Sequence, residues 1–285
     1  DLAGVLGKLT RRLFLMPHPT AIGNALEDFL FGLMYAKRNN IKLVTLVPHP
    51  LLQKTGLKIL DSKYLMYGNE WTQPRHGSKV YKYFSATVSV MYFVFRIATK
   101  IVYKIFRINL PDTFYHPSLG QDVIWRPKGK NGFDWQSAED LNWSQQFNDK
   151  NFRLTLPAEL ELQCTEEALR LGLPVAAWYV CIHVREGGYS KDETNFRNSD
   201  IKNYIESIKY ITSQGGWVIR MGDPSMQKLP SMEQVIDYAN HPAKNALLDI
   251  YLIEGCDFFI GTSSGMIHVA ELFNKPMLFT NAVSY

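Results

Sequence analysis

The sequence predicts an α/β protein with two domains, each built on a parallel sheet that helices cover. Its 285 residues are enough for two domains of about 100–200 residues each. Short apolar runs alternate with helical patterns in both halves, which is typical of parallel sheets. An irregular, turn-rich stretch separates the halves and places the domains at residues 1–151 and 152–285.

The first half contains one strand–helix–strand unit. Residues 13–16 form an apolar run closed by prolines, as a buried strand does. Residues 22–37 carry apolar side chains at helical spacing, and two asparagines after Arg38 favour a helix end. Residues 43–47 form the next apolar run. Because parallel strands need a crossover of a dozen or more residues, this unit predicts a parallel pair.

The segment that begins at Ser78 and ends at Arg107 is predicted as one long helix, because it lacks glycine and proline. It is apolar on most sides and basic toward its C-terminal half. Two interpretations stay open: the helix forms the core of the first domain, or it lies on an anionic membrane with its apolar face in the interface. The stretch from Trp125 to Trp143 is assigned to an irregular lobe.

The second half alternates regularly between strands and helices, which predicts a second doubly wound domain. The expected helices cover residues 157–171, 200–212 and 246–254, and a fourth ends near Phe273. The expected strands cover residues 178–184, 217–219, 235–238, 257–260 and 276–280. The charged residues at 191–193 and 202–209 are interpreted as solvated faces.

The composition excludes several classes of protein. With 46% hydrophobic and 20% charged residues, the chain is neither disordered nor a coiled coil. A net charge of +4 is too small to indicate a nucleic-acid partner. Three cysteines without a CxxC pair exclude a disulfide scaffold and a cysteine-rich zinc site, and favour a reducing compartment. Since neither a spanning apolar run nor a signal peptide is visible, we expect a cytoplasmic protein.

Three strand ends in the second half are unusually polar, and ligands of open parallel sheets bind at such ends. In the first, His183, Arg185 and Glu186 close a buried strand, and two glycines follow. Arginine is suited to bidentate hydrogen bonding with phosphate. Because His183 and Arg185 occupy alternate positions, they share one side of the strand. A strand that ends in a surface salt bridge is the alternative.

The second polar strand end carries Arg220, followed by the turn residues Gly222 and Asp223. Asp223 is a candidate to bind a ribose or sugar hydroxyl. A plain turn is the alternative.

The third polar strand end has the sequence Gly-Thr-Ser-Ser-Gly at residues 261–265, and we expect a helix to begin there at once. The N–H groups of such a helix, with the hydroxyls, would form a cradle for an anion. The residues in question are Thr262, Ser263, Ser264, Gly265 and His268. The pattern Gly-x-Ser-x-Gly also leaves a hydrolase open, although no Asp-then-His order follows it.

These strand ends carry a resemblance to known enzymes. Residues 261–275 resemble the sugar-nucleotide loop of GT-B glycosyltransferases, heptosyltransferases among them. The His-Val-Arg run at 183–185 is similar to the His-x-Arg signature of fucosyltransferase-like enzymes, whose arginine holds the nucleoside diphosphate. Residues 196–201 and 215–224 resemble a poorly characterised bacterial family of glycosyltransferases, and that resemblance extends over residues 179–280.

The resemblance implies a GT-B-like fold, with two Rossmann-like domains and a cleft between them. It implies a glycosyltransferase that moves a sugar from a nucleotide-diphosphate donor to a bacterial surface glycan or glycolipid, in cell-surface polysaccharide biosynthesis. The donor-binding residues would be His183, Arg185, Arg220, Gly222, Asp223, Thr262, Ser263, Ser264, Gly265 and His268. Fixed arginines can stabilise the departing diphosphate, and the chain has no Asp-x-Asp, so we expect no metal and no cofactor besides the donor substrate.

An inverting transfer needs a base that takes the proton of the acceptor hydroxyl, and the candidates are His18, Glu186 and Asp192. Two other functions stay open: a nucleotide-sugar epimerase of the same fold and a non-catalytic glycan-binding module. A glycolipid acceptor would place the protein at the inner face of the membrane. The chain ends at Tyr285, just after a strand, so we expect it to be shortened.

Overall fold

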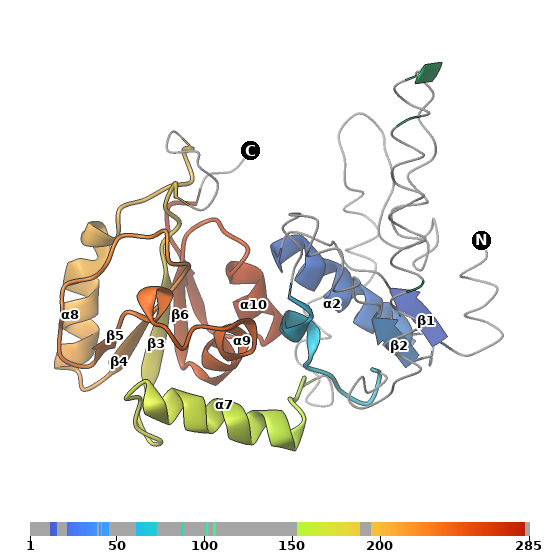
Figure 1. The fold of residues 1–285 in the computed structure, drawn as a ribbon, viewed down its shortest axis with the longest axis horizontal. Helices are drawn as coiled ribbons and strands as arrows, with labels where there is room; N and C mark the ends of the chain where they lie inside the picture. The colour runs from blue at the N-terminus through green and yellow to red at the C-terminus, as the bar shows by residue number, and fades with distance from the viewer. Residues whose placement is uncertain are drawn as a thin grey trace. The chain divides into compact units, whose positions relative to one another are not determined.

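The structure is a computed structural model, and it describes residues 12–15, 22–38, 40, 42–45, 61–72, 87, 101, 105–106, 153–188 and 195–282. The chain divides into two compact units, Asp1–Thr155 and Leu156–Tyr285. Figure 1 shows their helices and strands. The predicted division lay between residues 151 and 152, and the cleft expected between two domains stays a prediction.

The first unit contains the expected strand–helix–strand arrangement. β1 (Arg12–Leu15) and β2 (Lys42–Thr45) pair in parallel, and α2 (Ile22–Arg38) connects them. Asn40 has a φ of 52°, the left-handed conformation that commonly ends a helix, and its N–H donates to the Lys37 carbonyl. The apolar stripe of α2 is buried, as its spacing predicts, at Leu26, Phe29, Leu30, Leu33 and Met34.

A short segment adds to this unit beside β2. It contains the 3₁₀ turn η1 (Ser62–Leu65), and the Leu43 N–H donates to the Trp71 carbonyl at 2.7 Å. Of the long helix predicted from Ser78, the structure describes four residues, all helical and exposed: Thr87, Ile101, Ile105 and Phe106. The rest of that helix and the irregular lobe lie outside the described residues.

The second unit is built on a five-stranded parallel sheet. Its strands are β3 (Tyr179–His183), β4 (Trp217–Met221), β5 (Val235–Ile236), β6 (Phe258–Gly261) and β7 (Met277–Phe279). They lie in the order β5-β4-β3-β6-β7, and each neighbouring pair is parallel. β3 is therefore central, and the carboxyl ends of all five strands share one edge, hereafter the carboxyl edge.

Helices cover both faces of this sheet. They are α7 (Ala158–Arg170), η4 (Ile201–Tyr204), α8 (Ile205–Ser213), η5 (Tyr238–Asn240), α9 (Ala246–Gly255) and α10 (Ile267–Leu272). Figure 1 shows α8 on one side of the strands and α9 and α10 on the other. None of the helices in the described part of the chain is long and apolar enough to cross a bilayer.

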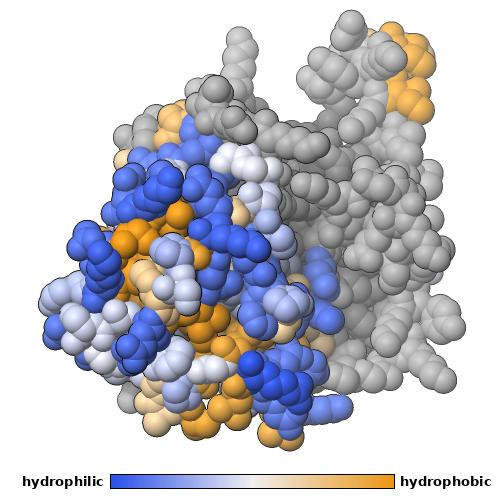
Figure 2. All heavy atoms as spheres, turned by 60° about the vertical axis from the view of Figure 1, so that its left-hand side comes forward, coloured by the Kyte–Doolittle hydropathy of each residue, from blue (hydrophilic) through white to orange (hydrophobic). Residues whose placement is uncertain are grey.

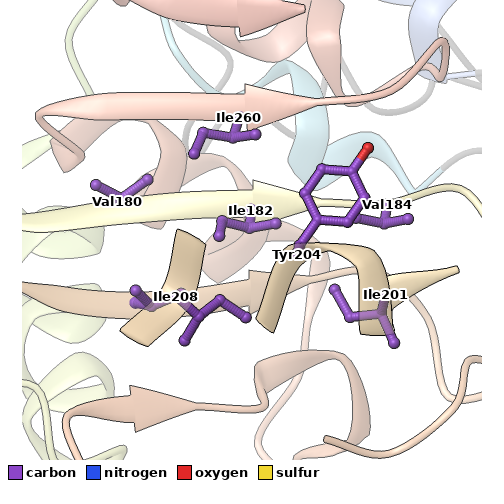
Figure 3. Close-up of a cluster of buried hydrophobic side chains, with 8 residues drawn as sticks. Val180, Ile182, Val184, Ile201, Tyr204, Ile208 and Ile260 are labelled. Carbon is purple, nitrogen blue, oxygen red and sulfur yellow. The ribbon is translucent and has the colours of Figure 1, made fainter. Parts of the chain in front are cut away.

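The core on the α8 side consists of alternate strand residues. Val180 and Ile182 of β3 lie under Tyr204 and Ile208 of η4 and α8, as Figure 3 shows, with Ile260 of β6 beside them. Since successive side chains of a strand point to opposite faces, Cys181 faces α9 instead, and its Sγ lies 3.4 Å from the Leu252 carbonyl. This alternation decides which polar residues at the strand ends lie on which face.

The outer face of α8 is solvated, as its charged residues predict. Lys209 pairs with Glu206 at 2.7 Å, and both side chains are exposed. Figure 2, with this side of the molecule turned forward, shows hydrophilic side chains surrounding smaller hydrophobic areas. Residues 191–193 lie outside the described residues.

Candidate functional site

The polar residues predicted from three strand ends gather at the carboxyl edge of the second unit. They follow β3, β4 and β6, which are neighbours in the sheet. Because neighbouring parallel strands end at the same edge, the sequence correctly brings these three ends together. Two of the predicted bases, His18 and Asp192, lie outside the described residues.

Arg185 is fixed just beyond the end of the central strand. Its backbone N–H donates to Thr262 Oγ1 at 2.8 Å, and its Nε donates to Asn198 Oδ1 at 3.2 Å. The Ser199 N–H donates to its carbonyl at 2.9 Å. Backbone and side chain are therefore both held, which gives a half-buried guanidinium a fixed position at the edge of the sheet.

Thr262 plays a different part from the one predicted. It is fully buried, its N–H donates to the His183 carbonyl at 3.1 Å, and its hydroxyl accepts the Arg185 N–H. All of these contacts join the end of β6 to the end of β3. The prediction that Thr262 contacts the donor does not fit this burial, because its polar groups are directed into the protein.

The loop of residues 261–265 leads into a helix that ends near Phe273, as the sequence predicts, but the helix does not begin at once. Residues 263–266 form bends and turns, and α10 begins only at Ile267 and has six residues. Ser263 and Ser264 lie half-buried in the loop before α10, so they do not lie within its first turn as the expected anion cradle requires. His268 lies on α10, where its Nδ1 contacts Glu271 Oε2 at 2.8 Å.

His183 and Ser264 form a contact across the ends of β3 and β6. His183 Nδ1 lies 3.0 Å from Ser264 Oγ, and the histidine is only 5% exposed. Burial, aided by the charge of Arg220, lowers the pKa of His183 to about 4, so the imidazole is neutral at pH 7. Such a histidine is a weak base. The hydrolase alternative loses support, because the central serine of the motif is Ser263 rather than the partner of this histidine.

Arg220 is the largest fully buried side chain of the described residues, and this corrects its predicted role. Its Nη2 donates to Glu186 Oε1 at 2.9 Å and its Nη1 to Asp237 Oδ1 at 3.2 Å, while its Nε has no hydrogen-bond partner. A phosphate outside the protein has no access to this guanidinium. Arg220 instead neutralises two carboxylates beneath the carboxyl edge.

The same network corrects the role of Glu186 as a candidate base. Its second oxygen, Oε2, accepts the Gln227 N–H at 2.7 Å, and its side chain is 10% exposed. Asp237 likewise accepts the Leu229 N–H at 3.0 Å. Because both oxygens of Glu186 are bound within the protein, the carboxylate serves to hold the chain after β4 and is not placed to accept a proton from a ligand.

Gly222 and Asp223 form the turn that leaves β4. Gly222 has a φ of 151°, and a Cβ at this position would lie 2.2 Å from the Met226 sulfur, so the turn requires glycine. Asp223 Oδ1 accepts from the N–H of Ser225 at 2.9 Å and from its hydroxyl at 2.5 Å. Asp223 is half-buried at the carboxyl edge.

Sequence reasoning missed the asparagines of this edge. Asn195 and Asn198 hold the side chains of Arg197 and Arg185, and Asn281, just after β7, donates to the carbonyls of residues 197 and 198. The available signal was the density of asparagine between β3 and η4. Asparagine is also common in plain turns, so that signal did not distinguish a site.

Among the residues that the structure describes, no three His, Cys, Asp or Glu side chains gather in a way that would hold a metal ion. Arginines carry positive charge at the carboxyl edge. Arg185 and Arg197 both lie between β3 and η4 in the chain.

No family model matches the sequence, and no curated protein matches it. Among solved structures, the crystal structure of the glycosyl transferase family 9 from Veillonella parvula DSM 2008 is similar to this chain, with 12% identity and a TM-score of 0.49. The match covers 94% of this chain and 79% of that one. A likeness at this level adds no argument about function.

Proposed function

We propose that the chain is a glycosyltransferase that moves a sugar from a nucleotide-diphosphate donor to a bacterial surface glycan or glycolipid. The observation that carries the proposal is Arg185, which is held by Thr262 and Asn198 at the end of the central strand of a parallel sheet. Ligands of such sheets bind at this edge, and arginine suits a diphosphate. The resemblance of residues 183–185 to the His-x-Arg signature agrees with this placement.

The chemistry of the transfer explains why a fixed arginine matters. When the bond between the sugar and the diphosphate breaks, negative charge develops on the departing oxygen. A preorganised guanidinium stabilises that charge without having to reorient. We therefore propose that Arg185 stabilises the leaving group, that Ser263, Ser264 and Gly265 lie along the diphosphate, and that Asp223 binds a hydroxyl of the ribose or the sugar.

The base for the acceptor hydroxyl is left to His18 and Asp192, since both oxygens of Glu186 are engaged by Arg220 and Gln227. His183 acts by holding Ser264 rather than by moving a proton, because its imidazole is a weak base. His268 keeps its proposed place near the donor, on the exposed side of α10.

Calorimetric titration with UDP-, GDP- and ADP-sugars tests the proposal. One donor class should bind, and Arg185→Ala should weaken its binding by about 10- to 100-fold, which is the usual effect of losing a charge-assisted hydrogen bond. Arg170→Ala is the matched control, because that arginine lies exposed on α7 in a pair with Glu166. If none of the three donors binds, or if both variants bind equally well, the proposal is wrong.

We also propose that the helix predicted from Ser78 contacts the cytoplasmic face of a membrane. Its described residues Ile101, Ile105 and Phe106 are 51%, 64% and 64% exposed, which suits an interfacial helix better than a core helix. Sedimentation with vesicles that contain phosphatidylglycerol should recover the protein, and Ile105→Ser with Phe106→Ser should reduce the recovery. Equal recovery of both proteins would contradict this contact.

A further inference from the structure

The loop of residues 195–199 packs onto the segment that follows β3. Ser199 donates its N–H to the carbonyl of Arg185, and Asn198 accepts from the Arg185 side chain. Asn281, which follows β7, donates its Nδ2 to the Arg197 carbonyl at 3.3 Å and to the Asn198 carbonyl at 3.2 Å. The loop is therefore held to two strand ends at once, and its position at the carboxyl edge is fixed.

This loop carries Arg197, and a single hydrogen bond to a described residue orients its side chain. Asn195 Oδ1 accepts both the backbone N–H of Arg197 at 3.1 Å and its Nε at 3.2 Å. Within the described residues, Asn195 is the only hydrogen-bond partner of this guanidinium. The nearest carboxylate along the chain, Asp200, accepts the Lys202 N–H at the start of η4.

The contrast with Arg220 is informative. Arg220 is fully buried and gives both of its Nη atoms to carboxylates, whereas Arg197 is half-buried and its Nη atoms bind no described residue. A guanidinium carries five N–H donors in a fixed fork. The bond to Asn195 uses the Nε donor, and the two Nη groups form the rest of the fork. That fork matches two oxygens of one phosphate.

We propose that Arg197 is a second anion-binding arginine, which together with Arg185 holds the diphosphate of the donor. The inference rests on the proposed function, because it names a further residue for the same ligand. A diphosphate carries more negative charge than one arginine neutralises. Arg220 is buried, whereas Arg197 lies one position before Asn198, whose side chain accepts from Arg185 Nε, so the loop that bonds to Arg185 also carries Arg197.

The test measures affinity by calorimetry for inorganic pyrophosphate and for UDP, GDP and ADP. Arg197→Ala should weaken the binding of pyrophosphate and the binding of the nucleotide alike, by about 10- to 100-fold. Arg197→Lys, which keeps the charge and loses the fork, should fall between wild type and Arg197→Ala. Lys209→Ala, which removes an exposed cation on α8, is the control and should change nothing.

Asn195→Ala gives a second variant in case Arg197→Ala does not fold. It keeps the arginine and releases its side chain, so binding should weaken by a smaller factor of about 3 to 10, since the guanidinium must then be ordered by the ligand. The thermal midpoint of each variant shows whether it is folded.

The outcomes separate the two proposals. If Arg185→Ala weakens nucleotide binding and Arg197→Ala does not, the inference is wrong and the proposed function stands. If pyrophosphate binds in an Arg197-dependent way but no nucleotide does, the anion site stands and the proposed donor is wrong. If neither pyrophosphate nor any nucleotide binds the wild-type protein, both proposals are wrong.

Discussion

Replacing Arg220 by methionine tests whether this arginine holds the protein together rather than binding a ligand. Methionine keeps an unbranched side chain that fills most of the same space, but it removes the charge. The variant loses the bonds of 2.9 Å to Glu186 and 3.2 Å to Asp237 and leaves both carboxylates without a counterion.

The size of the effect follows from these contacts. Each charge-assisted hydrogen bond contributes about 1.5–3 kcal/mol, and removing one partner of a buried ion pair costs about 3–5 kcal/mol. The carboxylates keep the N–H groups of Gln227 and Leu229, and their side chains are 10% and 20% exposed, so water offsets part of the loss. We expect the lower end of that range, about 3 kcal/mol. For a unit of this size, that lowers the thermal midpoint by roughly 10 °C.

Scanning calorimetry of wild type, Arg220→Met and Arg170→Met measures the difference. Arg170 pairs with Glu166 on the surface, with both side chains more than half exposed, so its loss should cost less than about 0.5 kcal/mol. Equal midpoints for the two variants would refute the structural role of Arg220. A variant of Arg220 that stays fully stable yet no longer binds nucleotide would restore the role in phosphate binding predicted from the sequence.

Three further predictions concern other residues of the second unit. The pKa of His183 is lowered to about 4 in the folded protein, against about 6.5 in an unfolded chain, so stability is complete above about pH 6.5 and decreases by roughly 3 kcal/mol toward pH 4. When urea midpoints are measured across this pH range, the midpoint of His183→Gln should not show this decrease. The same pH dependence in wild type and variant would contradict the prediction. Gly222→Ala should lower the stability by about 1–3 kcal/mol, because of the contact with Met226 and the positive φ. Gly215→Ala shares the positive φ but adds a Cβ in open space, so it should cost less, and thermal midpoints compare the two variants. Cys164, Cys181 and Cys256 are buried as free thiols, so a thiol reagent should react with them only after denaturation, and rapid reaction of the native protein would speak against their burial.

The elements were predictable where one local pattern determines them. The stripe of α2 and the apolar run of β3 depend on spacing within one segment, and both formed where the sequence placed them. The gathering of the polar strand ends at one edge of the sheet also followed, because the carboxyl ends of neighbouring parallel strands share an edge. Boundaries were less accurate after residues 261–265, where a helix was expected to begin at once and begins only at Ile267.

The roles of individual side chains were less predictable because their partners are distant in sequence. Arg220 looks like any strand-end arginine until Glu186, 34 positions away, and Asp237, 17 positions away, are brought to it by the fold. The hydroxyl of Thr262 is used by a backbone N–H 77 positions earlier. Asparagine side chains follow no sequence pattern that reveals their partners. Asn195 and Asn198 therefore did not indicate that they bind the side chains of Arg197 and Arg185.

The bond pattern of Asn281 has a consequence for the order in which the protein forms. Asn281 contacts loop carbonyls 83 and 84 positions earlier, whereas η4 and α8, which follow that loop, close through contacts within a few residues. Long-range contacts form later than local ones, because the chain between them must first lose its freedom. During synthesis the helices beside the loop can therefore fold early. The loop that carries Arg197 receives its hydrogen bonds from Asn281 only once β7 has paired with β6. A ribosome-bound chain that stops before β7 would hold most of the core of this unit and still lack its completed anion site.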